Sequence, residues 1–152
     1  MYQQNIPYNN MPTEEKLPGA YNRKDLRKMM VGFLLLSALC LVFSTIYNRY
    51  SHGVTSFYMT FLCLFPLLLG AVPSFLLSIH GFLPLPFQLS MNLYNTGLAA
   101  VTLSSAMRGI FEIAGTGSVL QVILMIIGIL FLIAGALVYI FQSIYLRLQS
   151  DR

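Results

Sequence analysis

The sequence predicts an all-α integral membrane protein: a four-helix bundle of up-down-up-down topology with the N-terminus and the C-terminus both cytoplasmic. Two observations lead to this fold class. Of the 152 residues, 57% are hydrophobic and only 9% are charged, whereas a water-soluble domain carries roughly 25% charged residues. The hydrophobic residues also gather in four long runs, and most of the charges lie outside them. We therefore expect lipid, rather than water, to surround most of the chain.

Residues 1–22 are expected to form a disordered cytoplasmic tail, because they are rich in Asn, Gln, Pro and Tyr and offer no hydrophobic face to bury. Five of the nine Lys and Arg residues precede the first hydrophobic run: Lys16, Arg23, Lys24, Arg27 and Lys28. Basic residues beside a span resist translocation and are attracted to anionic lipids, which places this end on the inner side. Residues 148–152 are expected to form a short cytoplasmic tail at the other end.

Residues 23–147 are expected to form the membrane domain, with spans at about 29–47, 55–79, 89–113 and 119–145. A hydrocarbon core of about 30 Å needs roughly 20 helical residues, and an open strand in lipid would leave backbone groups unpaired. Short connections make neighbouring spans antiparallel. Seven basic residues then lie on the inner side and two, Arg49 and Arg108, on the outer side, which sets the orientation.

The second span contains two candidate helix kinks, Pro66 and Pro73, which are seven residues apart and therefore on one helix face. Each proline lacks a backbone N–H and deprives the carbonyl one turn earlier of its helical donor. Kinks of this kind are common in membrane helices without a transport role, and broken helices also line cavities in transporters. Both interpretations remain open from the sequence.

The third span is unusually polar. Its small residues Gly97, Ala100 and Ser104 recur at three- and four-residue spacing and predict a helix-packing face, which is expected to continue to Arg108 and Glu112. Four residues apart, Arg108 and Glu112 can form an intramembrane polar pair, which is a candidate functional site. In the alternative, Arg108 extends to the headgroups at the outer interface and Glu112 is solvated.

The first and fourth spans carry small-residue patterns that predict further packing faces. In the first span, Ser37, Cys40 and Ser44 share one face, and in the fourth Gly128 and Gly135 lie seven residues apart. His52 and His80 fall in loops on opposite sides of the membrane, so they cannot share a metal ion. Phe82 to Phe87, a Pro-punctuated apolar segment, is expected to lie in the inner interface or to dock a cytoplasmic partner.

Sequence motifs of catalysis are absent: there is no nucleophile elbow, P-loop, dinucleotide fingerprint, catalytic carboxylate pair or metal-ligand cluster. Glu112 is the only acidic residue between Asp25 and Asp151, and acid–base catalysis needs titratable groups placed together. We therefore expect no enzyme, no cofactor and no nucleic-acid partner. In composition, the tail and four spans resemble small membrane proteins of Gram-positive bacteria, a resemblance that implies no activity. A bacterial cytoplasmic membrane is the favoured location.

Two classes of function follow from these patterns. The first is a non-catalytic structural or accessory subunit of a membrane assembly, which holds a protein partner or a second copy of itself through its helix faces. The second is an oligomeric small-solute or ion transporter, with a path between the kinked second span and the polar third one. A holin-like pore former is a weaker third alternative.

Overall fold

A computed structural model describes residues 19, 21–51, 53–79 and 84–150, with side chains described as far as Leu148. Every element in this part of the chain is helical: α1 (Arg23–Tyr50), α2 (Phe57–Thr60), the π-helix η2 (Phe65–Ala71), α3 (Val72–Ile79), α4 (Gln88–Ile113) and α5 (Val119–Ser150). The expectation of an all-α protein is confirmed. The four predicted spans correspond to α1, to α2–η2–α3, to α4 and to α5.

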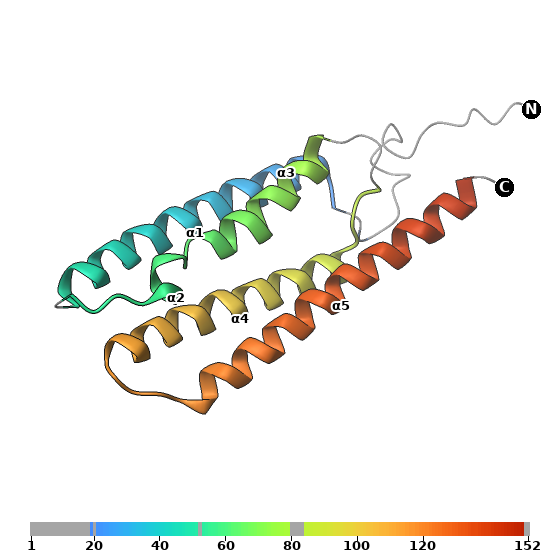
Figure 1. The fold of residues 1–152 in the computed structure, drawn as a ribbon. Coiled ribbons are helices and arrows are strands. Elements are labelled where there is room, and N and C mark those ends of the chain that lie inside the picture. The colour runs from blue at the N-terminus through green and yellow to red at the C-terminus, as the bar shows by residue number, and fades with distance from the viewer. Residues whose placement is uncertain (1–18, 20, 52, 80–83, 151–152) are drawn as a thin grey trace, which may run out of the picture.

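The helices form two antiparallel hairpins, α1 with α2–η2–α3 and α4 with α5, which lie side by side (Figure 1). Among the described helices, α5 comes within 8 Å, Cα to Cα, of α4 alone. Helix α1 comes that close only to α2, η2 and α3. The helices therefore follow one another in a row with α1 and α5 at its ends, and this part of the chain lacks the closing contact between first and last helices.

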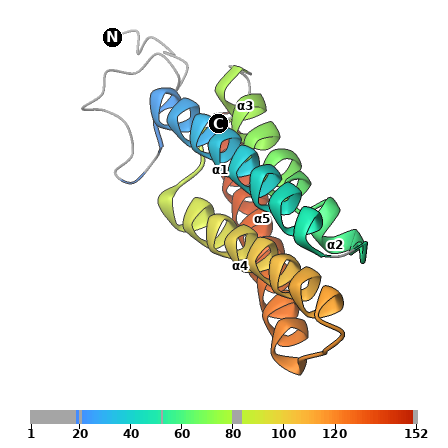
Figure 2. The same ribbon diagram turned by 90° about the vertical axis from the view of Figure 1, so that its left-hand side faces the viewer.

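The two hairpins touch over only part of their length. Helix α4 lies within 8 Å of α2 and η2, Cα to Cα, but not of α3. The views in Figures 1 and 2 show α3 turning away from α4 toward the end of the molecule at which α1 begins and α5 ends. We call this the basic end, because it carries Arg23, Lys24, Arg27, Lys28 and Arg147.

The second predicted span is a divided helix rather than one continuous helix. Helix α2 ends at Thr60, residues 61–63 form turns, and η2 and α3 complete the segment. Pro66 lies in the first turn of η2, whereas Pro73 lies inside the helical run that continues without a break from η2 into α3. A proline fits in the first turn of a helix, where its missing N–H has no intrahelical partner to lose, but it disrupts a helix interior.

Side chains of neighbouring helices donate hydrogen bonds to the backbone of this divided segment. On α1, the Ser44 hydroxyl donates to the Met59 carbonyl at 2.6 Å and the Ser37 hydroxyl to the Cys63 carbonyl at 2.9 Å. Both serines and Cys40 are buried on one face of α1. The Ser-Cys-Ser face of the first span therefore packs against the second span and supplies donors where its helix is interrupted.

Small residues bring α4 and α5 together. A Cβ atom added at Gly97 would lie 2.5 Å from the Leu132 backbone nitrogen, and one added at Gly128 would lie 3.0 Å from the Cβ of Ala100. A Cβ at Gly135 would lie 2.7 Å from the Tyr94 backbone nitrogen. The Ser104 hydroxyl donates to the Gln121 carbonyl at 2.6 Å. All five small residues singled out in these two spans thus lie in the α4–α5 interface.

The helix ends differ from the predicted ones at three places. Helix α1 begins at Arg23 and continues to Tyr50, because its basic first turns carry no helix-breaking residue. Helix α5 continues to Ser150, so residues 148–150 of the expected tail continue this helix. Within the expected tail, the Tyr21 N–H donates to the Pro86 carbonyl at 3.0 Å and so contacts the connection between α3 and α4. Residues 1–18 and 20, and residues 151–152, lie outside the described residues.

Among the described residues, two helices are long and apolar enough to cross a membrane: α1, with a mean hydropathy of 2.4, and residues 119–148 of α5, with 2.9. Only 17% and 11% of their most apolar windows are buried, respectively, whereas the core helix of a water-soluble protein is mostly buried. Residues 65–79 form a shorter apolar helix, and α4 does not reach this hydropathy. The apolar surfaces of α1 and α5 therefore face away from the protein.

Candidate functional site

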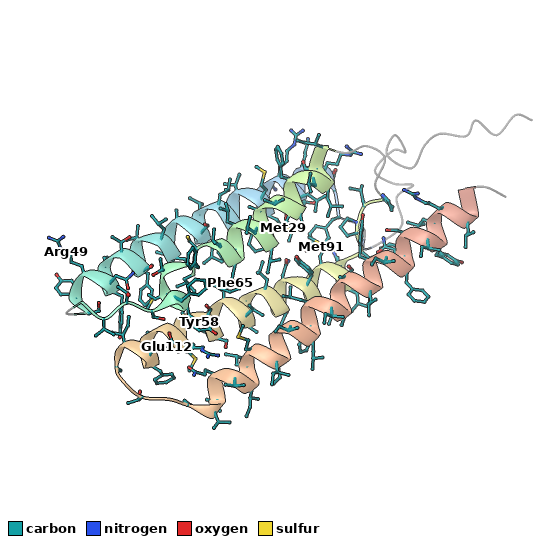
Figure 3. The ribbon with its side chains drawn as sticks, in the orientation of Figure 1. Met29, Arg49, Tyr58, Phe65, Met91 and Glu112 are labelled. Atoms are coloured by element: carbon teal, nitrogen blue, oxygen red, sulfur yellow. The ribbon has the colours of Figure 1, made fainter. Side chains whose placement is uncertain are left out.

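Arg108 and Glu112 form an ion pair on α4 that also contacts α2. The Arg108 Nε lies 3.4 Å from the Glu112 Oε1, and the Ser56 hydroxyl donates to the Glu112 Oε2 at 2.6 Å. The Arg108 Cζ lies 4.2 Å from the centroid of the Tyr58 ring. In Figure 3, Tyr58 and Glu112 lie close together at the end of the molecule opposite the basic end. We call Ser56, Tyr58, Arg108 and Glu112 the clasp.

The clasp is partly open to its surroundings, with 37% of the Arg108 side chain and 41% of the Glu112 side chain exposed. Arg108 and Glu112 are therefore paired, as in the first alternative from the sequence, and are also partly exposed, as in the second. An exposed ion pair contributes at most about 1 kcal/mol, and a cation–π contact at such a site about 0.5–1 kcal/mol. Contributions of this size position α2 but cannot hold the hairpins together alone.

Backbone contacts beside the clasp bring α2 against α4. The Ser56 hydroxyl accepts from the Met59 N–H at 3.5 Å and so caps α2, while the Ser105 hydroxyl donates to the Tyr58 carbonyl at 3.5 Å. A Cβ atom at Gly109 would lie 3.0 Å from the Met59 backbone nitrogen. The geometry is that of a structural joint between the hairpins.

The small residues of α4 and the clasp use different faces of that helix, which corrects the expectation of one continuous face. Ser104 contacts α5, whereas Arg108 and Glu112 contact α2. Four residues advance a helix by about 400°, so a residue eight positions later points about 80° away. Glu112 is eight residues after Ser104, and the face seen in the sequence therefore turns from one neighbouring helix to the other.

A pocket of about 330 Å³ lies where the two hairpins separate, toward the basic end. Helix α3 lines it with Pro73, Ser74, Leu76 and Leu77, and Phe33 of α1 closes one side. The other residues that line it come from α4, α5 and the connection between α3 and α4: Pro86, Ser90, Met91, Tyr94, Asn95, Gly135, Ala136, Tyr139 and Ile140. None of these residues carries a charge at neutral pH.

Two polar contacts fix the walls of this pocket. The Tyr94 hydroxyl donates to the Leu69 carbonyl at 2.8 Å, which ties α4 to η2 at the point where the hairpins begin to diverge. The Ser90 hydroxyl donates to the Gly135 carbonyl at 2.9 Å and so ties α4 to α5. The side-chain oxygen of Asn95 is buried and has no hydrogen-bond partner in the described part of the chain.

The connection between α3 and α4 is held in place at the basic end. The Gln142 side chain of α5 donates to the Leu85 carbonyl at 2.9 Å and accepts from the Phe87 N–H at 3.1 Å, as a neighbouring strand would. On the other side, Gly19 accepts from the Gln88 N–H at 2.8 Å. Leu85 is buried, 2% exposed, in a cluster with Leu26 and Met91. Residues 84–87, the described part of the apolar Phe82–Phe87 segment, thus form contacts within the chain.

Sequence reasoning did not single out Tyr94 or Gln142 as contact residues. Gln142 could have been found from its position, because it is one of few hydrogen-bonding side chains in an otherwise apolar span. For Tyr94 the sequence contains no such signal, because its partner is a backbone carbonyl in another helix. His52 and His80 lie outside the described residues.

A second face of α4 is exposed and polar. Asn92 and Thr96 lie one turn apart, both are exposed, and neither side chain forms a hydrogen bond in the described structure. Ala99 and Leu103 continue this face. Gln88 is the first residue of α4, so at 1.5 Å per residue Thr96 lies about 12 Å inside the helix.

Within the residues that the structure describes, no three His, Cys, Asp or Glu side chains are grouped so that they could hold a metal ion. No family model matches the chain, and no curated protein or solved structure matches it.

Proposed function

We propose that the chain is a multi-pass membrane protein that serves as a non-catalytic structural or accessory subunit of a membrane assembly, in a cell membrane and with its basic end inside. Four segments cross the bilayer in this proposal: α1, α2–η2–α3, α4 and α5. Besides lipid, its partner is another membrane protein or a second copy of the chain.

The polar groups of α4 support its placement in the bilayer although it is less apolar than α1 and α5. Ser90, Ser104 and Thr102 are buried and donate to backbone carbonyls. A polar group that is satisfied within the protein does not carry the cost of an unpaired group in hydrocarbon. The polar residues that still need a partner in the bilayer are therefore those on the exposed side of α4.

The observation that carries the proposal is the exposed pair Asn92 and Thr96 on α4. In hydrocarbon, side-chain amides and hydroxyls seek partners across helix interfaces, and small residues such as Ala99 allow a close approach of another backbone. The face that these three residues form has no neighbour among the residues that the structure describes, so a helix of a partner is expected to cover it.

Purification in a mild detergent, followed by mass spectrometry of the intact complex, tests the proposal. We expect a stoichiometric companion or a defined homo-oligomer with the wild-type chain, and its loss in Asn92→Leu and Thr96→Val. Thr45→Val is the matched control, because the exposed Thr45 hydroxyl bonds to the Leu41 carbonyl of its own helix. A monomer that persists at all detergent concentrations, or equal assembly of wild type and both α4 variants, would refute the proposal.

The transport alternative receives less support from the geometry. A path for a hydrophilic solute needs polar or charged groups on its walls, whereas the accessible walls of the pocket between the hairpins are almost entirely apolar, and the Ser90 and Tyr94 hydroxyls donate to backbone carbonyls. The ionisable pair lies at the opposite end and contacts Ser56 and Tyr58 instead. Flux through liposomes that carry the pure protein, abolished by Glu112→Gln, would favour transport over the accessory role.

A further inference from the structure

The pocket between the hairpins suits a small apolar occupant. Its volume is about 330 Å³, roughly twice that of an engineered apolar cavity that binds benzene. One turn of a partner helix, about 5.4 Å long and about 10 Å across with its side chains, takes roughly 400 Å³, which exceeds the volume of the pocket. Apolar walls also retain water poorly, and an empty apolar space forfeits the dispersion contacts of its lining.

The pocket opens toward the surroundings of α3 and α5. Leu76 on α3 and Ile140 on α5 line it and are 45% and 50% exposed. These two helices do not approach within 8 Å of each other, Cα to Cα. The exposed apolar face of α5, which includes Leu137 and Ile144, lies beside the opening. An occupant therefore enters from the phase that bathes this face, which is the hydrocarbon of the bilayer in the proposed placement.

Arginine side chains lie just beyond the pocket at the basic end. Leu77 lines the pocket, and the next residue, Ser78, accepts hydrogen bonds from two arginines of α1. The Arg27 Nε donates to the Ser78 hydroxyl at 3.2 Å, and the Arg23 Nη1 donates to the Ser78 carbonyl at 3.5 Å. A guanidinium carries five N–H donors, so each arginine keeps several for a further acceptor such as a phosphate oxygen. Ser74, which lines the pocket, is one helical turn, about 6 Å along α3, from Ser78.

We propose that this pocket holds part of an acyl chain of an anionic phospholipid, whose phosphate lies at Arg23 and Arg27. The inference rests on the proposed placement of the chain in a membrane, but not on its role as an accessory subunit. The positive charges select the lipid class. The two arginines lie one helical turn beyond the apolar pocket, where they attract a negatively charged headgroup whose acyl chain enters the pocket.

Native mass spectrometry of the full chain tests this site with phosphatidylglycerol and phosphatidylcholine that carry identical acyl chains. We expect one retained phosphatidylglycerol, favoured over phosphatidylcholine by about fivefold for each arginine that contacts the phosphate. Ala136→Phe fills the pocket and should abolish retention of both lipids, whereas Ala38→Phe, the same change on an exposed face of α1, should not. The pair Arg23→Gln and Arg27→Gln should remove the preference for phosphatidylglycerol, and Arg49→Gln at the opposite end should keep it.

A second measurement on the wild-type chain covers the case in which Ala136→Phe fails to fold. Phosphatidylglycerol with a diazirine in one acyl chain is photolysed in vesicles, and the labelled peptides are sequenced. Labelling concentrated at Leu77, Tyr94 and Tyr139 supports the site. Labelling spread over the exposed faces of α1 and α5 overturns the site. So does Ala136→Phe protein that retains the two lipids as well as the wild-type chain does. Extraction of the chain from membranes by alkaline carbonate would instead refute the membrane placement itself.

Discussion

The Tyr94 hydroxyl on α4 donates a 2.8 Å hydrogen bond to the carbonyl of Leu69, the carbonyl one turn before Pro73. Pro73 has no N–H to offer this carbonyl, so the helix that runs from η2 into α3 presents an acceptor toward α4. One tyrosine therefore joins the two hairpins at the level where they begin to diverge and the pocket opens. Pro73 and the junction between the hairpins therefore belong to one arrangement.

Removal of this hydroxyl should weaken the junction between the hairpins. We expect Tyr94→Phe to lower the free energy of unfolding in detergent by about 1 kcal/mol, the size typical of a side-chain hydrogen bond between membrane helices. Tyr50→Phe is the control, because Tyr50 is 77% exposed. Equal stability of the two variants would show that the Leu69 carbonyl does not depend on Tyr94.

The close approach of α4 and α5 predicts strong sensitivity to added volume at Gly97. A Cβ there would lie 2.5 Å from the Leu132 nitrogen and 2.7 Å from the Gly128 oxygen, both backbone atoms that cannot turn away. Gly97→Ala should destabilise the protein by about 1–3 kcal/mol, as overpacking does. Gly32→Ala on α1 meets nothing within 4 Å and should be neutral or stabilising, because alanine favours helix. Thermal unfolding of the two variants in one detergent compares them directly.

Serine donors on α1 should matter where the second span is interrupted. Ser44→Ala removes the 2.6 Å hydrogen bond to the carbonyl of Met59, a fully buried residue. We expect a loss of about 1 kcal/mol in unfolding free energy. Ser143→Ala is the matched control, since its hydroxyl bonds to the Tyr139 carbonyl within its own helix. If both alanine variants unfold alike, the Ser44 contact contributes nothing beyond local helix geometry.

The clasp predicts coupled effects of its two charged residues. Arg108→Ala and Glu112→Ala should each lower the amount of folded protein in the membrane modestly, and the double variant should be little worse than either single one, because both changes break the same ion pair. Lys28→Ala, in an exposed pair 3.8 Å from Asp25, should have no effect. Strictly additive losses in a double-mutant cycle would contradict this interpretation of the pair.

Replacement of Glu112 by glutamine separates charge from hydrogen bonding. A glutamine carbonyl can still accept from the Ser56 hydroxyl, so Glu112→Gln should fold and retain its companion in mild detergent. A stable Glu112→Gln protein that loses its companion would show that the charge itself takes part in assembly.

The orientation is tested by thiol labelling of intact cells in a variant in which Cys40 and Cys63 are alanine. Thr116→Cys, in the exposed connection between α4 and α5, should react with a membrane-impermeant reagent from outside. Lys24→Cys, exposed at the basic end, should react only after permeabilisation, because basic flanks stay inside. The reverse pattern would leave the helices unchanged and invert the two sides.

The helical class and the positions of α1 and α5, though not their ends, could be predicted from the sequence, because long apolar runs favour helices, whose backbone hydrogen bonds are made within the segment. The small residues Gly97, Gly128 and Gly135 also predicted close helix packing, since residues without a large side chain allow two helix backbones to approach each other. These are local properties of composition and spacing. They do not depend on which helix is the neighbour.

Tertiary structure decided the neighbours. The sequence could not show that Ser104 faces α5 while Glu112 faces α2, because the direction of each side chain depends on where two other helices lie. Nor could it show that the second predicted span is interrupted at residues 61–63, just before Pro66, since the cost of the break depends on a donor from another helix, the Ser37 hydroxyl of α1. Hydrophobicity is a property of each residue and is visible in the chain, whereas a hydrogen bond across helices exists only once both partners are placed.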